Sequence, residues 1–178
     1  MEIIKNFRGI DFLALLLFLR IIYTSLRSGL VAEIIKMIGV FLASFFSLQF
    51  YPVFLRRFKD VLSNPGYLDF FSILVIFCGV STVFFILVKI FITLTKEREI
   101  FLWERIISLC VGLARASLLV SLFIFAFSFL PEGENPYKES ISGRFFKKVA
   151  PYAYVYTFKF FKKINPTFKF NKEVEEVL

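Results

Sequence analysis

Few side chains in this sequence are of the types that carry out chemistry. Histidine is absent, and the two cysteines, Cys78 and Cys110, both stand among apolar residues. This set offers no His/Cys cluster with metal-ligand spacing and no Ser–His or Cys–His pair for nucleophilic catalysis. We therefore expect no catalytic residue, no metal and no cofactor, and a protein that is not an enzyme.

The charged residues inside apolar blocks are the more informative group. They are Arg20, Glu33, Lys36, Lys89, Glu104, Arg105 and Arg115. At the centre of a membrane helix each would cost roughly 2.5–3.5 kcal/mol, so that together they would oppose insertion. The sequence therefore predicts that these charges are paired with one another or lie near a membrane surface.

The blocks that carry these charges are long enough to cross a bilayer. Of the 178 residues 58% are hydrophobic and 27 are Phe, which excludes an ordinary soluble domain. Apolar runs of membrane-spanning length cover residues 11–26, 30–55, 68–94 and 102–130. The first run also resembles a signal peptide, but no A-x-A site follows it, so we expect an uncleaved helix. The prediction is an all-α integral membrane four-helix bundle formed by residues 1–130.

Residues 131–178 form a basic, aromatic C-terminal tail. Between residues 145 and 163, clusters of Lys flank Phe and Tyr residues. This pattern suits a segment that lies in the headgroup layer of an anionic membrane. It equally suits a small helical subdomain that packs its rings on itself, and both alternatives stay open.

The distribution of charge indicates partners and topology. A net charge of +8 beside so much apolar sequence favours anionic lipids over nucleic acid. Four spans place the N-terminus, residues 56–67 and the tail on one side of the membrane, and residues 27–29 and 95–101 on the other. Near the span ends, nine basic residues lie on the first side and three on the second. The second count rises to seven if Arg20, Lys36, Lys89 and Arg105 extend to that surface, so the positive-inside rule favours neither orientation. Gly29 could close the first hairpin with a positive φ.

Charges and small residues share one stripe on each of two spans. The stripe on the second span contains Glu33, Lys36, Ala43 and Ser47, with Gly39 at its edge. The stripe on the fourth span contains Glu104, Ser108, Gly112 and Arg115, with Ala116 at its edge. Small residues allow close helix approach, so we predict that the stripes meet. Parallel spans starting at one depth would pair Glu33 with Arg105. Arg115, too deep to reach the surface easily, is the strongest candidate for a functional residue.

These residues also carry a family resemblance. Asp11 opens the first span; Arg27, Gly29, Leu30 and Glu33 form an R-x-G-L-x-x-E hairpin followed by Gly39 and Ala43; Glu104, Arg105, Gly112 and Arg115 open the fourth span; and Tyr137, Glu139 and Ser140 precede Pro151. In these motifs the sequence resembles the colicin V production protein family of bacterial inner-membrane proteins, over roughly residues 10–151. It departs from the family pattern at Ala32, where a basic residue is common.

The resemblance implies a multi-pass protein of the bacterial inner membrane. It implies an accessory or scaffold role in toxin production or export and in envelope homeostasis, and no catalytic residues carry over. We expect a membrane-protein partner or a homo-oligomer. The functional or packing candidates are Arg27, Gly29, Glu33, Lys36, Gly39, Glu104, Arg105, Gly112 and Arg115. The alternative is a small oligomeric transporter or channel in which Arg20, Lys89 and Arg115 line a path for an anionic solute.

Overall fold

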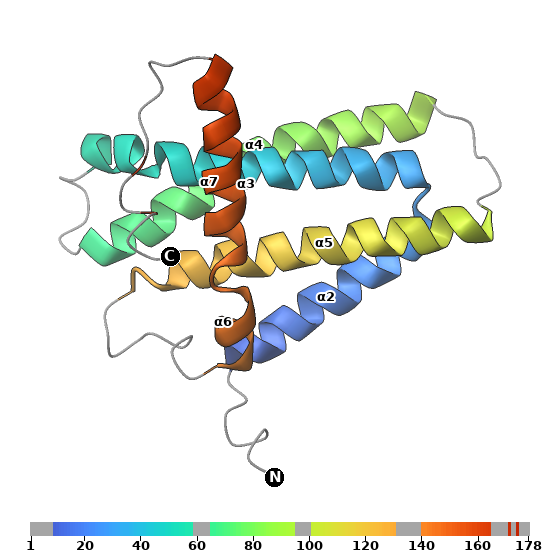
Figure 1. Ribbon diagram of the computed structural model, residues 1–178, viewed down its shortest axis with the longest axis horizontal. Helices are drawn as coiled ribbons and strands as arrows, with labels where there is room; N and C mark the ends of the chain where they lie inside the picture. The colour runs from blue at the N-terminus through green and yellow to red at the C-terminus, as the bar shows by residue number, and fades with distance from the viewer. Residues whose placement is uncertain are drawn as a thin grey trace, which may run out of the picture.

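The computed structural model describes residues 9–58, 65–94, 101–130, 140–164, 171 and 174, and the regular structure in this part of the chain is helical. The helices are α2 (Gly9–Arg27), α3 (Leu30–Phe58), α4 (Pro65–Leu94), α5 (Leu102–Phe127), α6 (Ile141–Phe146) and α7 (Val149–Ile164) (Figure 1). The predicted all-α four-helix bundle with a helical tail is confirmed.

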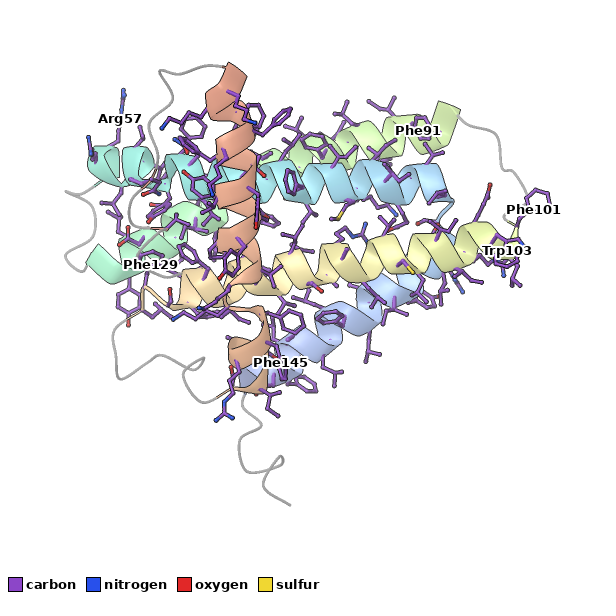
Figure 2. The ribbon with its side chains drawn as sticks, viewed as in Figure 1. Arg57, Phe91, Phe101, Trp103, Phe129 and Phe145 are labelled. Carbon is purple, nitrogen blue, oxygen red and sulfur yellow. The ribbon has the colours of Figure 1, made fainter. Side chains whose placement is uncertain are left out.

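The four long helices are α2 to α5. Helices α2, α3 and α4 each contain a predicted span, whereas α5 ends at Phe127, before the end of the predicted span 102–130. All four are long and apolar enough to cross a membrane. The helices exceed the predictions by a few residues at some ends, because polar residues such as Arg56 and Arg57 continue the helix beyond its apolar run. Arg57 stands at one end of the bundle, and the exposed rings of Phe101 and Trp103 stand at the other (Figure 2). Aromatic rings at a helix end are typical of a membrane interface.

The long helices form an open arrangement rather than a closed square. Helix α3 packs along α4, and α5 packs on both α2 and α3. Helices α2 and α4 do not pack extensively on each other, and α4 touches α5 only sparsely. The order α2, α5, α3, α4 therefore leaves a groove between α2 and α4, with α3 and α5 as its floor.

Helix α7 lies across α3 and α5, roughly perpendicular to them (Figure 1). Its residues Ala150, Tyr154 and Phe158 are buried in the main apolar core with side chains of α3, α4 and α5. The backbone N–H of Ala150 donates to Ser121 Oγ of α5 at 2.6 Å. One face of α7 therefore packs its rings on the bundle, while Tyr152, Tyr156 and Phe160 stay exposed on the opposite face.

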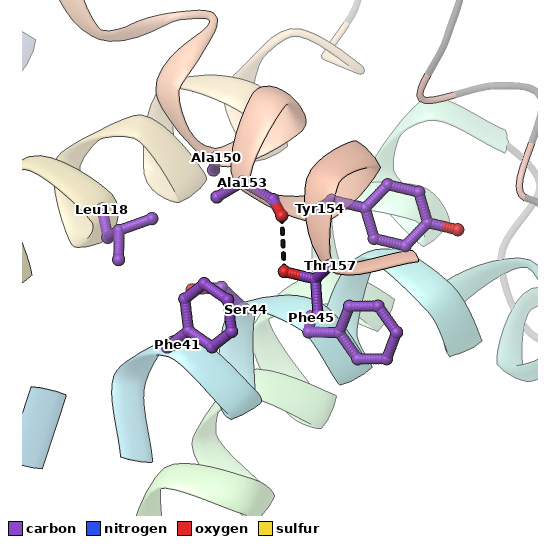
Figure 3. A pocket seen from close by; sticks show the side chains of 8 residues that line it. All are labelled: Phe41, Ser44, Phe45, Leu118, Ala150, Ala153, Tyr154 and Thr157. Atoms are coloured by element: carbon purple, nitrogen blue, oxygen red, sulfur yellow. Dashed lines mark hydrogen bonds between the residues drawn. The ribbon is translucent and has the colours of Figure 1, made fainter. Parts of the chain in front are cut away.

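The interface of α7 with the bundle is closely packed. A cavity of about 10 Å³ remains there, lined by residues that include Ser44, Leu118 and Thr157 (Figure 3). This volume is close to the minimum that holds one water molecule. The cavity is therefore a packing defect and too small for a ligand.

Pro52 lies inside α3 and leaves one helical carbonyl without its usual donor. Proline has no N–H, so the carbonyl of Leu48, four residues earlier, cannot accept the regular α-helical bond. The side-chain Nδ2 of Asn171 donates to this carbonyl at 2.7 Å. The backbone N–H of Asn171 donates to Tyr154 Oη at 3.1 Å, and Tyr154 Oη donates to Gln49 Oε1 at 2.6 Å. A residue near the C-terminus thus satisfies a buried group that α3 cannot satisfy itself.

Candidate functional site

Glu33 is the centre of a buried ionic cluster between α3 and α5. Its side chain has 0% exposure. Glu33 Oε2 lies 3.1 Å from Arg115 Nη1, and Glu33 Oε1 lies 2.7 Å from Lys36 Nζ, one turn further along α3. An isolated carboxylate at this depth would be strongly unfavourable, and two cations compensate it.

Two serines at the end of α2 complete the cluster. Ser25 Oγ donates to Glu33 Oε2 at 3.0 Å, and Lys36 Nζ donates to Ser28 Oγ at 2.7 Å. The short link between α2 and α3 places these hydroxyls beside the first two turns of α3. Sequence reasoning missed both serines, although their position one turn apart at the end of a tight hairpin was the available signal.

Arg115, and not Arg105, is the partner of Glu33. The predicted Glu33–Arg105 ion pair is wrong: Arg105 is exposed near the start of α5, and Glu33 bonds to Arg115, ten residues later. The prediction assumed that α3 and α5 begin at the same depth. The first turns of α5 instead extend beyond the start of α3 (Figure 1), which brings Arg115 level with Glu33. The charged stripes of α3 and α5 therefore do meet, but with Glu33 opposite Arg115 instead of Arg105.

The small residues of these stripes serve other contacts than predicted. A Cβ added at Gly39 would lie 2.7 Å from Cβ of Phe84 on α4, and one added at Gly112 would lie 2.8 Å from Cβ of Ser25 on α2. The lack of a side chain at Gly39 thus allows α4 to pack closely on α3, and the lack of one at Gly112 allows α2 to pack closely on α5. The two glycines do not bring α3 and α5 together; each lets a neighbouring helix approach.

The remaining predicted residues lie outside the cluster. Arg27 ends α2 with its guanidinium 4.4 Å from the centre of the Tyr23 ring, and Glu104 is half-buried in the first turn of α5. Gly29 does not have the positive φ that we expected. Instead, Ser28 follows the last residue of α2, and its N–H and its hydroxyl both donate to the carbonyl of Thr24.

The ionic cluster borders the groove between α2 and α4. This groove has a volume of about 860 Å³, within the range of ligand sites. Basic residues from all four long helices line it, namely Arg20, Lys36, Lys89 and Arg115. Its other walls are mostly apolar, with Phe77 and Leu119 toward the middle of the bundle, and also include the hydroxyls of Thr24, Ser81 and Thr93. The site therefore combines positive charge with an apolar surface, a chemistry suited to an anionic ligand with an apolar part.

Comparison with known proteins agrees with the sequence motifs. The family model described as colicin V production protein matches residues 10–151 of the 178. The chain belongs to the colicin V production protein family. The described part of the chain has four helices long and apolar enough to cross a membrane, and it is a multi-pass membrane protein of this family. No curated protein and no solved structure matched the chain.

The structure brings together motif residues of this colicin V production family member that lie far apart in the sequence. Glu33 of the hairpin motif meets Arg115 of the fourth-span motif. Asp11, which opens the first span, meets the helix that Ser140 of the tail motif caps. Tyr137 and Glu139 of the tail motif lie outside the described residues.

Proposed function

We propose that this chain is a non-enzymatic accessory protein of the bacterial inner membrane. In this role it acts as a scaffold that supports production or export of the toxin colicin V and contributes to envelope homeostasis. The family match supports the toxin-related role, and the groove supports binding of a partner or lipid rather than chemistry.

The observation that carries this proposal is the position of the basic groove. Charged side chains at membrane depth are unfavourable, and they are retained where they bind, conduct or pair. Lys36 and Arg115 are paired with Glu33, but among the described residues Arg20 and Lys89 have no ion-pair partner. The positive charge that the cluster leaves uncompensated therefore faces the groove and is available to an anionic partner.

Complementation of a deletion strain tests the proposal. The strain carries a colicin V determinant and expresses either the wild type or the double variant Arg20→Gln/Lys89→Gln. We expect the variant to reach normal membrane abundance and to release much less toxin, because Arg20 and Lys89 are exposed and support no packing.

The matched control is Arg56→Gln/Arg57→Gln, which removes the same charge from the exposed end of α3 outside the groove. It should complement fully. Full toxin release by the Arg20/Lys89 variant would contradict the proposed role of the groove.

The same groove is the reason to consider a second function, a path for an anionic solute. Phe77 and Leu119 line its inner part, and Phe77 belongs to the packed core. In one copy of the chain, the polar entrance of the groove therefore leads to apolar side chains that would stop an anion. Conduction would need several copies. Anion flux into liposomes that contain the purified protein would support this second function, and its absence would favour the scaffold.

A further inference from the structure

We propose that the groove between α2 and α4 is a specific binding site for one anionic phospholipid. The inference deepens the proposed function and rests on it, since it names the ligand of the same groove. The headgroup would lie against Arg20 and Lys89, and an acyl chain would lie along the apolar face of α4.

Charge is the first argument for an anionic ligand. The four basic residues of the groove and the adjoining Glu33 sum to a formal charge of +3. Glu33 already contacts Lys36 and Arg115, so Arg20 and Lys89 carry the charge that a ligand could neutralise. A phosphate provides several acceptor oxygens for an Arg and a Lys together.

Depth is the second argument, because it matches a lipid headgroup. Arg20 lies seven residues before the end of α2, and Lys89 lies five residues before the end of α4. At 1.5 Å per residue both lie within about 10 Å of the helix ends on the same side of the bundle. The long side chains of Arg20 and Lys89 can extend from this depth toward the phosphodiester of a lipid at the membrane surface.

The shape and lining of the groove indicate that the ligand has an apolar chain. Because α2 and α4 do not pack extensively on each other, the groove opens sideways, toward the hydrocarbon of a bilayer. Phe84, Phe85 and Val88 of α4 line it beside Lys89. Ser81 also lines the groove, and its buried hydroxyl has no hydrogen-bond partner among the described residues. Free phosphate would leave this surface unused, whereas a phospholipid would cover it.

Native mass spectrometry of the full chain in detergent tests the proposal. Phosphatidylglycerol, phosphatidylcholine and inorganic phosphate are added separately to delipidated protein. We expect one phosphatidylglycerol per chain to bind, with an affinity at least about tenfold above that for phosphatidylcholine. Inorganic phosphate should not displace it. Equal binding of the two lipids, or displacement by phosphate alone, would overturn the proposal.

Variants locate the site. Arg20→Gln/Lys89→Gln should lose the preference for phosphatidylglycerol, whereas Arg20→Lys/Lys89→Arg, which keeps both charges, should retain it. Arg56→Gln/Arg57→Gln should bind like the wild type, which separates the groove from general attraction to basic residues. Unchanged preference in Arg20→Gln/Lys89→Gln would overturn the assignment of the site.

The lipid assay tests the lipid inference and the complementation assay tests the proposed function, so the two can be contradicted separately. If the Arg20/Lys89 variant binds phosphatidylglycerol normally but does not complement, the lipid inference is wrong and the groove still has a function. If the variant loses the lipid and complements fully, the lipid site stands and the proposed function is wrong.

Discussion

The carboxylate of Asp11 accepts a hydrogen bond at 2.7 Å from the backbone N–H of Ser142, a residue 131 positions further along the chain. Asp11 is buried in the first turn of α2, and Ser142 is in the first turn of α6. Ser140 caps the same helix, accepting from the N–H of Gly143 at 2.9 Å. A carboxylate at the start of a helix satisfies a free N–H and interacts favourably with the helix dipole. Asp11 thus fixes the start of α6 to the first turn of α2.

Replacing Asp11 tests this link. Asp11→Ala should lower the free energy of unfolding in detergent by about 1–2 kcal/mol, because a charge-assisted bond is lost and a partly buried N–H loses its acceptor. Asp11→Asn keeps an acceptor oxygen and should lose less. Thermal unfolding of the three proteins measures the order, and equal loss in the two variants would show that the bond is unimportant.

Asn171 should stabilise the protein through the carbonyl that Pro52 leaves free. Asn171→Ala should destabilise by about 1–3 kcal/mol, because the carbonyl of Leu48 is then buried without a donor. In a Pro52→Ala background the helix regains its own N–H, so the same Asn171→Ala change should destabilise less. A double-mutant cycle on unfolding free energies measures this coupling, and strict additivity would contradict it.

Glycine substitutions test the helix contacts. Gly112→Ala and Gly39→Ala should destabilise the protein, since the new methyl groups would overlap Ser25 and Phe84. The matched control is Gly79→Ala in α4, where a Cβ meets nothing within 4 Å. That change should be neutral or stabilise by about 0.5–1 kcal/mol, because Ala favours the helix. Thermal midpoints compare the three variants, and similar midpoints for all three would refute the close contacts.

Alkaline pH should weaken the docking of the tail. Burial raises the pKa of Tyr154 to about 12 from its ordinary value of 10.0, and the hydrogen bond from Asn171 only partly offsets this effect. The phenol stays protonated in the folded state while it ionises in the unfolded state, so stability present below pH 10 is lost as the pH rises toward 12. The thermal midpoint of the wild type should therefore fall more steeply above pH 10 than that of Tyr154→Phe. Parallel pH profiles of the two proteins would contradict this role.

The sequence was sufficient to predict the spans but not their register. Apolar runs of membrane-spanning length reveal helices α2 to α5 directly, because the bilayer demands that length. The pairing of Glu33 with Arg115 depends on how far α5 extends past the start of α3, and no local pattern encodes that offset. The candidates Glu33, Lys36 and Arg115 do form one cluster, whereas Arg105 and Arg27 are exposed.

The tail illustrates a second limit of sequence reasoning. Its aromatic rings with flanking lysine clusters predict an amphipathic segment, and α7 is amphipathic. The surface on which it packs is formed by α3 and α5, far away in the sequence. Likewise, Pro52 in a helix implies that the carbonyl of Leu48 lacks its usual donor, but only the fold shows that Asn171 donates to this carbonyl.

The central claim is that a buried Glu33–Arg115 pair joins α3 to α5 at the floor of the groove. The most direct test is a pair of double-mutant cycles on unfolding free energies in detergent, one with Glu33→Gln and Arg115→Gln and one with Glu33→Gln and Arg105→Gln. We predict a coupling of about 1–2 kcal/mol in the first cycle, because either single change takes an ion-pair partner from a buried charge. The second cycle should be additive, since Arg105 is exposed and lies ten residues from Arg115. Additivity in the first cycle, or coupling of Glu33 to Arg105 in the second, would contradict the account.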